Sequence, residues 1–528
     1  MPMKKRTRFF SKQEWSWIMY DWANSIYATN IMAAIFPTIF VSIAGDAGDQ
    51  WLGYAISAST FLIAICAPLL GAIADYKGMK KKLFTAFMLL GVVFTALIAA
   101  TNDWRVMLIG YMVSRIGFSA SNLFYDSFLT DVTTDERMDK VSSWGYAMGY
   151  IGGSTIPFVI SIAVLLLMGY SNPFAQKFSI LITSVWWLVF SIPFIKNVKQ
   201  EHYLEPTGER DIRRTLKNIG HTARDIVTRK GLLLFIIAYF FYIDGVGTII
   251  NISTAYGSVL GLGSVGMILA LLVTQIVAMP CTILFSRIAA KINARKALSC
   301  AIIVYMLICI VGFYMGFSLE PKQAAYEYAY AESFQSVAGQ YAPEALNGNT
   351  TPAYDAAYDA FIKEADAAFL KADYVEAAAG LTLTSDATDD VTTALISQFA
   401  APLKEAATAF VRTDMEAIDG YRAAIRLSTI LFWAMAFLVG TVQGGIQAVS
   451  RSYYGKLIPK DRSNEFFGFF DIFGKFASVV GPLLYSLITG LTGRSSMGVL
   501  CLVVLFALGL LMLTLGRKEL DALTERKA

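Results

Sequence analysis

Charged residues are scarce in this sequence, and histidine is almost absent. Only 16% of the 528 residues are Asp, Glu, Lys or Arg, whereas soluble domains carry roughly 25%. The two histidines, His202 and His221, lie in one polar connection, which argues against a histidine-ligated metal site in the apolar segments. Because 56% of the residues are hydrophobic, the composition predicts an integral membrane protein.

Cysteine is also rare. The five cysteines fall inside apolar runs and form no Cys-x-x-Cys pair: Cys66, Cys281, Cys300, Cys309 and Cys501. Cysteines in such surroundings are typical of buried, inert positions. We therefore expect neither a disulfide nor a bound metal.

Motifs for covalent chemistry and nucleotide use are missing as well. The sequence has no Gly-x-x-x-x-Gly-Lys-Ser/Thr loop, so an ATP-driven pump is not expected. It also has no clustered nucleophile or metal-ligand set that would mark an enzyme. We expect no catalytic residues, no cofactor and no nucleic-acid partner.

Long apolar runs are abundant instead. A run of about eighteen residues or more can cross a hydrocarbon core about 30 Å thick, and helices satisfy their own backbone polar groups in lipid. No small-residue cleavage site follows the first run, so we expect that run to remain as a helix. The predicted fold is all-α, with twelve transmembrane helices near 16–43, 51–74, 83–101, 104–129, 142–168, 176–197, 231–257, 264–290, 297–317, 424–450, 464–490 and 495–516.

The basic residues between the runs predict the orientation. Lys and Arg gather before the first run and after the second, sixth, eighth and twelfth, whereas the connections 44–50 and 258–263 have none. Because cytoplasmic loops carry an excess of Lys and Arg, we expect both termini to be cytoplasmic. In a bacterium, the chain would lie in the inner membrane.

Two long connections divide the chain. Residues 1–197 form the predicted N-terminal six-helix half, 198–230 a basic cytoplasmic connection, and 231–528 the C-terminal half. Within the second half, the acidic insertion 318–423 is rich in Ala and Tyr and is expected on the outside. We interpret it as a small helical cap rather than a solute-capturing domain, with helices broken by Pro321, Pro343, Pro352 and Pro402.

The two halves resemble each other at matching places. Asp21 in the first run and Asp244 in the seventh each place one carboxylate, followed by small polar residues, inside an apolar helix. An acid-Arg pair follows the fourth run at Glu136-Arg137 and the tenth at Asp461-Arg462. These matches predict a parallel repeat of two six-helix halves, with the solute bound between them near the midplane.

The connection after the second run carries a longer motif. Residues 71–82 read Gly-Ala-Ile-Ala-Asp-Tyr-Lys-Gly-Met-Lys-Lys-Lys. This motif resembles the Gly-x-x-x-Asp-(Arg/Lys)-x-Gly-basic-basic loop of the major facilitator superfamily, with the usual basic position shifted by one. The corresponding connection after the eighth run has Ala290 where the aspartate would stand. The resemblance implies a permease with the twelve-helix fold of that superfamily.

Further segments resemble one branch of the superfamily, the branch related to the fungal vacuolar amino-acid effluxer of autophagy. They are residues 20–25, 244–250, 443–451, 465–470 and 474–477. The match covers nearly the whole chain except 318–423. The resemblance says less about the substrate than about the fold; we interpret the solute as a small polar molecule such as an amino acid or a similar zwitterion, with protons as the coupling ion.

Polar side chains inside the predicted spans are the candidates for solute binding and coupling. A charge near the centre of a membrane helix costs roughly 2.5–3.5 kcal/mol, so each one needs a reason. We favour a functional role for Arg115 and Asp244, leave Asp21 open between function and a structural ion pair, and favour the structural role for Asp126. The amides that would orient a solute, or equally join helices, are Asn24, Asn122, Gln443 and Gln447.

A second set of residues is assigned to gating at the cytoplasmic surface. Asp75 is expected to meet a helix N-terminus or a basic residue of the other half, a contact that inward opening would break. The full set is Gly71, Asp75, Lys77, Gly78, Arg137 and Arg462. The competing interpretation is that residues 77–82 only set the topology.

Together these features predict a secondary active transporter that moves its solute by alternating access. Its partners would be the solute, protons and the lipid bilayer, and the chain would act as a monomer. Two alternatives stay open. One is a lipid flippase of the same fold, and the other is a membrane receptor or scaffold that binds without transport.

Overall fold

The structure is a computed structural model. It describes residues 9–525 except for 170, 206–211, 263, 347–349, 353, 357, 361, 364–401, 403–404, 407–408 and 411–414. Within this described part the chain is helical, and the β-type pairing there is an isolated bridge between Tyr76 and Leu204.

The membrane spans agree with the twelve predicted helices. In the described part of the chain, eleven helical segments are long and apolar enough to cross a membrane. A further helix, α5 (Trp104–Ser127), has 24 residues, but its apolar run is interrupted by Arg115 and Asp126. With α5 included, the predicted fold is confirmed.

The first half begins with an interrupted helix. A capping box at Ser11 and Glu14 starts α1 (Lys12–Ile26), since each side chain accepts a backbone N–H of the other residue. A π-helical turn, η1 (Tyr27–Ala33), then leads into α2 (Ile35–Ala44). The rest of this half consists of η2 (Gly45–Ala47), α3 (Gly48–Ala74), α4 (Met79–Ala100), α5, α6 (Leu129–Val132), α7 (Asp135–Met148), η3 (Gly149–Thr155), α8 (Ile156–Met168) and α9 (Pro173–Asn197).

The second half follows an amphipathic connection, α10 (Ile212–Thr228). Its first helices are α11 (Lys230–Val259), α12 (Ser264–Ile292) and α13 (Ala294–Tyr330). Short helical pieces of the insertion come next, η4 (Ala331–Gln335), α14 (Ser336–Ala338) and η5 (Gly339–Tyr341). The chain ends with α18 (Met415–Leu457), η6 (Lys460–Arg462), α19 (Ser463–Thr492), α20 (Ser495–Leu515) and α21 (Arg517–Glu525).

The predicted break at Pro321 is wrong. The ninth span was expected to end near residue 317, but α13 continues to Tyr330 with Pro321 inside the helix. Beyond the proline, Tyr326 stacks on Tyr421 of α18 with ring centroids 4.4 Å apart. This packing stabilises both helices beyond the membrane and offsets the cost of the missing proline N–H. Residues 364–401 of the predicted cap lie outside the described residues.

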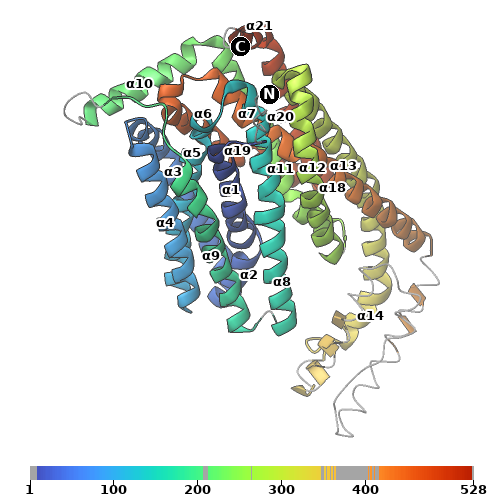
Figure 1. Cartoon of the computed structure of the whole chain (residues 1–528). Coiled ribbons are helices and arrows are strands. Elements are labelled where there is room, and N and C mark those ends of the chain that lie inside the picture. Colours follow the sequence, from blue (N-terminus) through green and yellow to red (C-terminus); the bar gives the residue numbers. More distant parts are fainter. Residues whose placement is uncertain are drawn as a thin grey trace, which may run out of the picture.

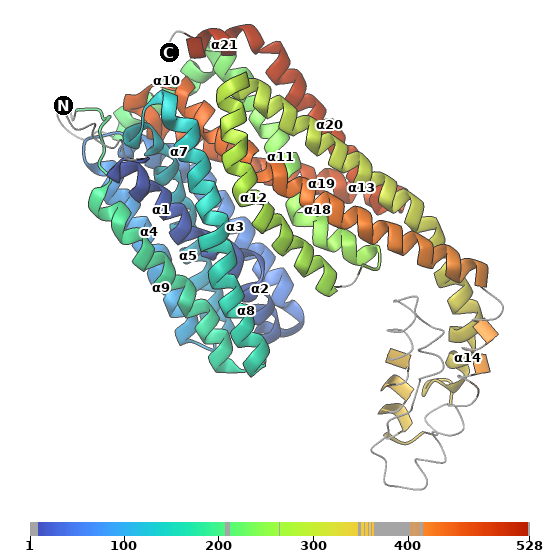
Figure 2. The same cartoon turned by 45° about the vertical axis from the view of Figure 1, so that its right-hand side comes forward.

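The two halves lie side by side and diverge along the bundle (Figures 1 and 2). At one end, which carries the start of α1 and the C-terminal α21, helices of the two halves pack together. The packed pairs are α3 with α19, and α7 with α12 and α18. The insertion extends from the opposite end, where the halves are further apart. We call these ends the terminal face and the insertion face.

Candidate functional site

Arg451 is a buried cation that joins the two halves. Its side chain, on α18, is only 4% exposed. Nη1 donates to Oδ1 of Asp126 on α5 at 2.8 Å, and Nη2 donates to Oδ2 of Asp21 on α1 at 3.4 Å. Nε and Nη2 also donate to the side-chain and backbone oxygens of Ser142 on α7. A positive charge of the second half is therefore neutralised by carboxylates of the first half.

Aromatic rings enclose the same guanidinium. It lies 4.7 Å from the ring centroid of Trp17 and 4.5 Å from that of Tyr146. Tyr125 adds a third ring at 5.3 Å and donates its hydroxyl hydrogen to Oδ2 of Asp21 at 2.7 Å. Such cation–π contacts are strongest when water is excluded, so the rings help to stabilise the buried charge.

A polar cavity of ≈200 Å³ lies beside this ion network. Asp126 lines it from the first half, and Asp471 and Lys475 line it from α19. Lys475 forms an ion pair with Asp471 one helical turn earlier. Tyr239 of α11 closes one side, where its ring stacks on Phe470 at 3.9 Å. The cavity therefore presents both signs of charge between the two halves.

The charges of this region do not balance. The described residues that form the network and line the cavity contribute three carboxylates, Asp21, Asp126 and Asp471, and two cations, Arg451 and Lys475. The formal sum is one uncompensated negative charge. Because an unbalanced charge is costly in membrane surroundings, the region favours a further cation, either a proton or a cationic group of a solute.

At the terminal face, Asp75 contacts the start of α19. Its Oδ1 accepts hydrogen bonds from the backbone N–H of Asn464 at 2.9 Å and from Nδ2 of Asn464 at 2.7 Å. Its Oδ2 accepts the backbone N–H of Glu465 at 3.0 Å. The free N–H groups of a helix N-terminus favour a carboxylate at this position. We call this contact the Asp75 latch.

The Asp75 latch depends on close approach of α3 to α19. A Cβ at Gly71 would lie 2.4 Å from the carbonyl oxygen of Asn464, so only glycine fits there without a shift of the backbone. Burial raises the pKa of Asp75 to about 7, although Lys80 and the N–H donors of Asn464 and Glu465 act to lower it. The latch therefore titrates near neutral pH.

Lys80 supports the latch from the side. Its Nζ donates to Oδ2 of Asp131 at 2.7 Å and to Oγ of Ser463 at 3.1 Å, in the other half. Burial acts to raise the pKa of Asp131, but Lys80 and the hydrogen bonds from His202 outweigh it and hold the pKa below its ordinary value. The buried pair thus fixes α4, α6 and the segment after α9 around the latch.

Two more ion pairs cross between the halves at the terminal face. Lys456 of α18 pairs with Asp139 of α7 at 2.7 Å, and Lys460 pairs with Asp135 at 3.0 Å. Ser452 also donates to Asp139 at 2.6 Å. These contacts, the Arg451 network and the Asp75 latch all lie toward the terminal face, so the halves are joined there in this conformation.

The structure does not bring Arg115 and Asp244 together. Arg115 donates to Oγ1 of Thr60 at 3.1 Å and to the hydroxyl of Tyr111 at 3.3 Å, both within the first half. Asp244 is fully buried and faces the backbone of α19 at Gly481. Neither of its carboxylate oxygens has a hydrogen-bond partner among the described residues. Asp244 points into its own half, and no ion pair joins it to Arg115 among the described residues.

The predicted amides are divided between two places. Nδ2 of Asn24 donates to Oδ1 of Asn122 at 2.6 Å, so this pair joins α1 to α5 within the first half. Gln443 is buried on α18 and lines a second cavity, whereas Gln447 on the same face is partly exposed.

Among the described residues, the other predicted gating residues contact their own half or the connection 198–230. Arg137 forms a paired contact with Glu14, with N–O distances of 2.7 and 2.8 Å. Arg462 pairs with Asp225 of α10 at 3.0 Å. Lys77 is exposed and pairs with Glu205 at 2.9 Å. Gly78, with φ +72°, forms the turn before α4. In the described residues, therefore, none of these three basic side chains bridges the halves.

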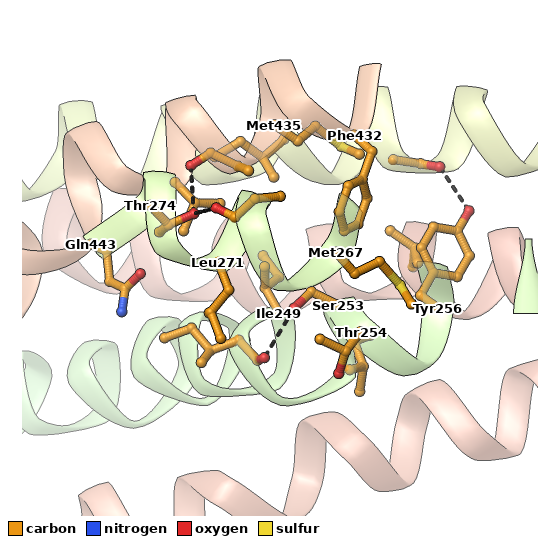
Figure 3. Close-up of a pocket in the computed structure, with 18 of the residues that line it drawn as sticks. Ile249, Ser253, Thr254, Tyr256, Met267, Leu271, Thr274, Phe432, Met435 and Gln443 are labelled. Carbon is orange, nitrogen blue, oxygen red and sulfur yellow. Dashed lines mark hydrogen bonds between the residues drawn. The ribbon is translucent and has the colours of Figure 1, made fainter. Parts of the chain in front are cut away.

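The second cavity is an apolar one of ≈110 Å³ inside the second half, between α11, α12, α13, α18 and α20 (Figure 3). Aliphatic, methionine and aromatic side chains form most of its wall, and Gln443 lies at one end. Gln275 also lines it, and its buried Oε1 has no hydrogen-bond partner among the described residues. The cavity can hold an apolar group together with one hydrogen-bond donor.

Sequence reasoning missed Arg451, Asp471 and Lys475 as site residues. Arg451 stood at the end of a recognised motif, but an arginine near the end of a span is normally attributed to topology. Asp471 and Lys475 are four residues apart inside an apolar helix, a spacing that predicts an ion pair. That spacing was the available signal for a charged site on α19.

Comparison with known proteins gives consistent results. The family model described as "Vacuole effluxer Atg22 like" matches residues 51–337 and 428–519. A protein of Bacillus subtilis (strain 168) called "Uncharacterized MFS-type transporter YxiO" is 37% identical over 523 residues, which cover 97% of this chain and 96% of that protein. Autophagy-related protein 22 of Eremothecium gossypii is 47% identical over 60 residues, 11% of this chain and 12% of that protein.

Solved structures agree on the fold. The human organic anion transporter MFSD10 (TETRAN) superposes with a TM-score of 0.52 at 13% identity, over 95% of this chain and 99% of that one. The Major Facilitator Superfamily transporter FucP in its outward conformation superposes with a TM-score of 0.55 at 10% identity, over 96% of this chain and 98% of that one. At these identities the likeness concerns the fold alone.

Proposed function

Because this chain belongs to the family of vacuole effluxer Atg22-like transporters, we propose that it is a secondary active transporter that moves a small zwitterion, such as an amino acid, by alternating access. The family establishes a multi-pass membrane transporter of the major facilitator fold. The observation that carries the finer proposal is the contact of Arg451 with Asp126 and Asp21 across the two halves.

The place where the halves are joined supports alternating access. Residues 1–197 and 231–528 act as the two moving bodies, and 198–230 connects them on the cytoplasmic side. A solute that passes the terminal face must separate the Asp75 latch and the Arg451 network. Because these are discrete contacts between rigid halves, the transporter switches between two states.

The charges of the inter-half cavity support a zwitterionic solute. Asp126 offers a carboxylate from one half and Lys475 an ammonium from the other. A solute with its own ammonium and carboxylate would satisfy both groups and would favour approach of the halves around it. An amino acid has these two groups at a fixed short separation.

The permanence of the arginine charge supports proton coupling. Arg451 cannot deprotonate at any working pH. When the halves separate at the terminal face, Asp21 and Asp126 lose it as a partner, and a proton compensates each carboxylate. Asp244, which lacks a partner among the described residues, is a third carboxylate available for this exchange.

Transport in reconstituted vesicles tests the proposal. Each of the common amino acids is offered in labelled form, with and without a pH gradient. Arg451→Gln should reduce gradient-driven flux about 100-fold or more, because it leaves two buried carboxylates without their cation. Arg295→Gln is the matched control, since Arg295 forms an ion pair with Asp521 outside the interface. Full gradient-driven flux through Arg451→Gln would contradict the proposal.

The apolar cavity of the second half favours one other candidate, a lipid flippase of the same fold. Its wall of aliphatic, methionine and aromatic side chains suits acyl chains. The same vesicles, loaded with a fluorescent phospholipid, separate the two functions. Lipid exchange between leaflets without amino-acid flux would contradict zwitterion transport and favour the flippase function.

A further inference from the structure

A third cavity, which is basic, lies at the edge of the first half on the terminal face. Its volume is ≈910 Å³. The turn before α4, the first turns of that helix and the segment after α9 form its wall, which includes Lys77, Lys81, Lys82, Lys199, Glu201 and Tyr203. It is separate from both cavities described above, and the transport proposal does not use it.

The cavity carries an excess of positive charge. Four lysines line it, against the single carboxylate of Glu201. The ion pair of Lys77 with Glu205 neutralises one of them, so the formal sum is +2. Among the described residues, Lys82 and Lys199 have no acidic partner within ion-pair distance.

The amino group of Lys81 is held in place. Its Nζ donates to the backbone carbonyl of Val198 at 2.8 Å, which fixes the side chain across the gap between α4 and the end of α9. A second hydrogen bond, from the backbone N–H of Gly78 to Oε1 of Gln200 at 2.9 Å, closes the gap from the other side. The lysines are therefore arranged around a formed cavity rather than spread over a loose loop.

An apolar track leads away from the lysines along the lipid-facing side of α4. Leu89 is 41% exposed and lines the cavity itself. Val93 and Leu97 follow at four-residue spacing, each 49% exposed, so the three lie on one face. Helix α9 packs against α4 and presents its own exposed aliphatic side chains, Val185, Val189 and Ile192.

We propose that this basic cavity binds the phosphate headgroup of an anionic phospholipid, whose acyl chains lie along α4 and α9. The cavity lies where α4 begins and α9 ends, at the level of a membrane surface. Basic cavities next to membrane helices attract anionic headgroups, and the aliphatic track below suits the chains of the same molecule. A soluble anion would use the lysines but not the track.

Native mass spectrometry of the purified full chain tests the site, with phosphatidylglycerol and phosphatidylcholine as the probes. The double variant Lys82→Gln/Lys199→Gln removes two lysines that lack acidic partners among the described residues and leaves the hydrogen bond of Lys81 intact. Its matched control is Lys291→Gln/Lys518→Gln, which removes two exposed lysines from the second half. The wild type should retain phosphatidylglycerol at least tenfold more strongly than phosphatidylcholine.

The double variant should lose about tenfold in phosphatidylglycerol affinity, and the control should change less than twofold. Equal losses in both variants would reduce the effect to general surface charge and overturn the proposal. Glycerophosphoglycerol, the headgroup without chains, and inorganic phosphate should each bind at least tenfold more weakly than the lipid. Binding of either as strongly as the lipid would make this a site for a soluble anion and would also overturn the proposal.

Discussion

Arg451 on α18 donates to Asp126 on α5 at 2.8 Å, so a cation of the second half is neutralised in the first half. The arginines near the starts of α7 and α19 behave differently. Arg137 pairs with Glu14 within the first half, and Arg462 pairs with Asp225 of the connecting helix α10. The protein therefore contains two classes of ion pair. One class joins residues within a half or ties a half to the connection 198–230, and the other must break for the halves to move apart.

Asp75→Asn should shift the protein toward opening at the terminal face. The carboxylate accepts three N–H donors, and an amide nitrogen in place of Oδ2 would face the N–H of Glu465 as a second donor. An unsatisfied buried donor costs about 1–3 kcal/mol, which corresponds to a shift of roughly tenfold or more in the equilibrium. The rate at which a thiol reagent labels a cysteine placed at Ala448, a buried interface position, would measure this shift toward opening.

Lys77→Gln is the control for this substitution. Lys77 lies two residues away, but its ion pair with Glu205 is exposed and is worth little. In Lys77→Gln the cysteine at Ala448 should be as accessible as it is in the wild type. If Asp75→Asn also left accessibility and transport unchanged, Asp75 would be reduced to a topology residue.

The Asp75 latch should respond to pH near neutrality. Burial raises the pKa of Asp75 from 3.8 to about 7 in the closed contact, and solvation after separation would return it toward the lower value. A raised pKa means that the proton binds preferentially to Asp75 in the closed state. The stabilisation of the closed state by this proton is therefore complete below pH 3.8 and is lost as the pH rises through about 7. The cysteine at Ala448 should therefore react more slowly at about pH 6 than at about pH 8. The same pH response in Asp75→Asn would assign it to another group.

The fold was predictable from the sequence because each span is encoded by its own apolar run. Even α5 was recognisable, although Arg115 and Asp126 interrupt it. The end of α13 was not predictable in the same way. It is set by the stacking of Tyr326 on Tyr421, a residue 95 positions later in the chain (421 minus 326). The expectation that a proline ends a helix takes only neighbouring residues into account, so it could not anticipate that contact.

The candidate site was predictable only in part, for a related reason. Asp75 stands in a recognised motif, from which its contact with a helix N-terminus of the other half was expected. Arg451 has partners 325 and 430 positions away in the sequence, and no periodicity links such residues. The direction of the Asp244 side chain depends on how α11 rotates against α19, and the sequence of α11 alone does not determine that rotation.

The orientation of the chain is tested with single cysteines on a background without the five native ones. We predict that both termini and 198–230 are cytoplasmic, and that 318–423 is external, because basic residues gather on one side. Gly220→Cys and Ala360→Cys are exposed reporters. In intact cells an impermeant thiol reagent should label position 360 but not position 220. The reverse pattern would overturn the topology.

The outer part of the insertion should be dispensable for transport. Residues 342–408 are replaced by a Gly/Ser linker, which retains the contact of Tyr326 and Tyr330 with Phe410 and so preserves the ends of α13 and α18. Solute affinity should stay within about twofold of the wild type. A loss of tenfold, about 1.4 kcal/mol, in a normally folded variant would make the insertion part of the binding site.

The last prediction concerns the two charged residues that the structure keeps apart, Arg115 and Asp244. Asp244 is buried with both oxygens unpartnered among the described residues, so a proton, or a solute cation in another conformation, must compensate it. Asp244→Asn keeps the shape and removes the exchangeable proton. It should bind solute normally but lose acceleration by a pH gradient. Arg115→Gln should instead lose affinity for an anionic or zwitterionic solute, because Arg115 has only neutral hydrogen-bond partners, Thr60 and Tyr111, among the described residues and keeps its charge for a ligand. Full proton-driven accumulation by Asp244→Asn would remove it from the coupling scheme, and Asp21 and Asp126 would then be the carboxylates that exchange the proton.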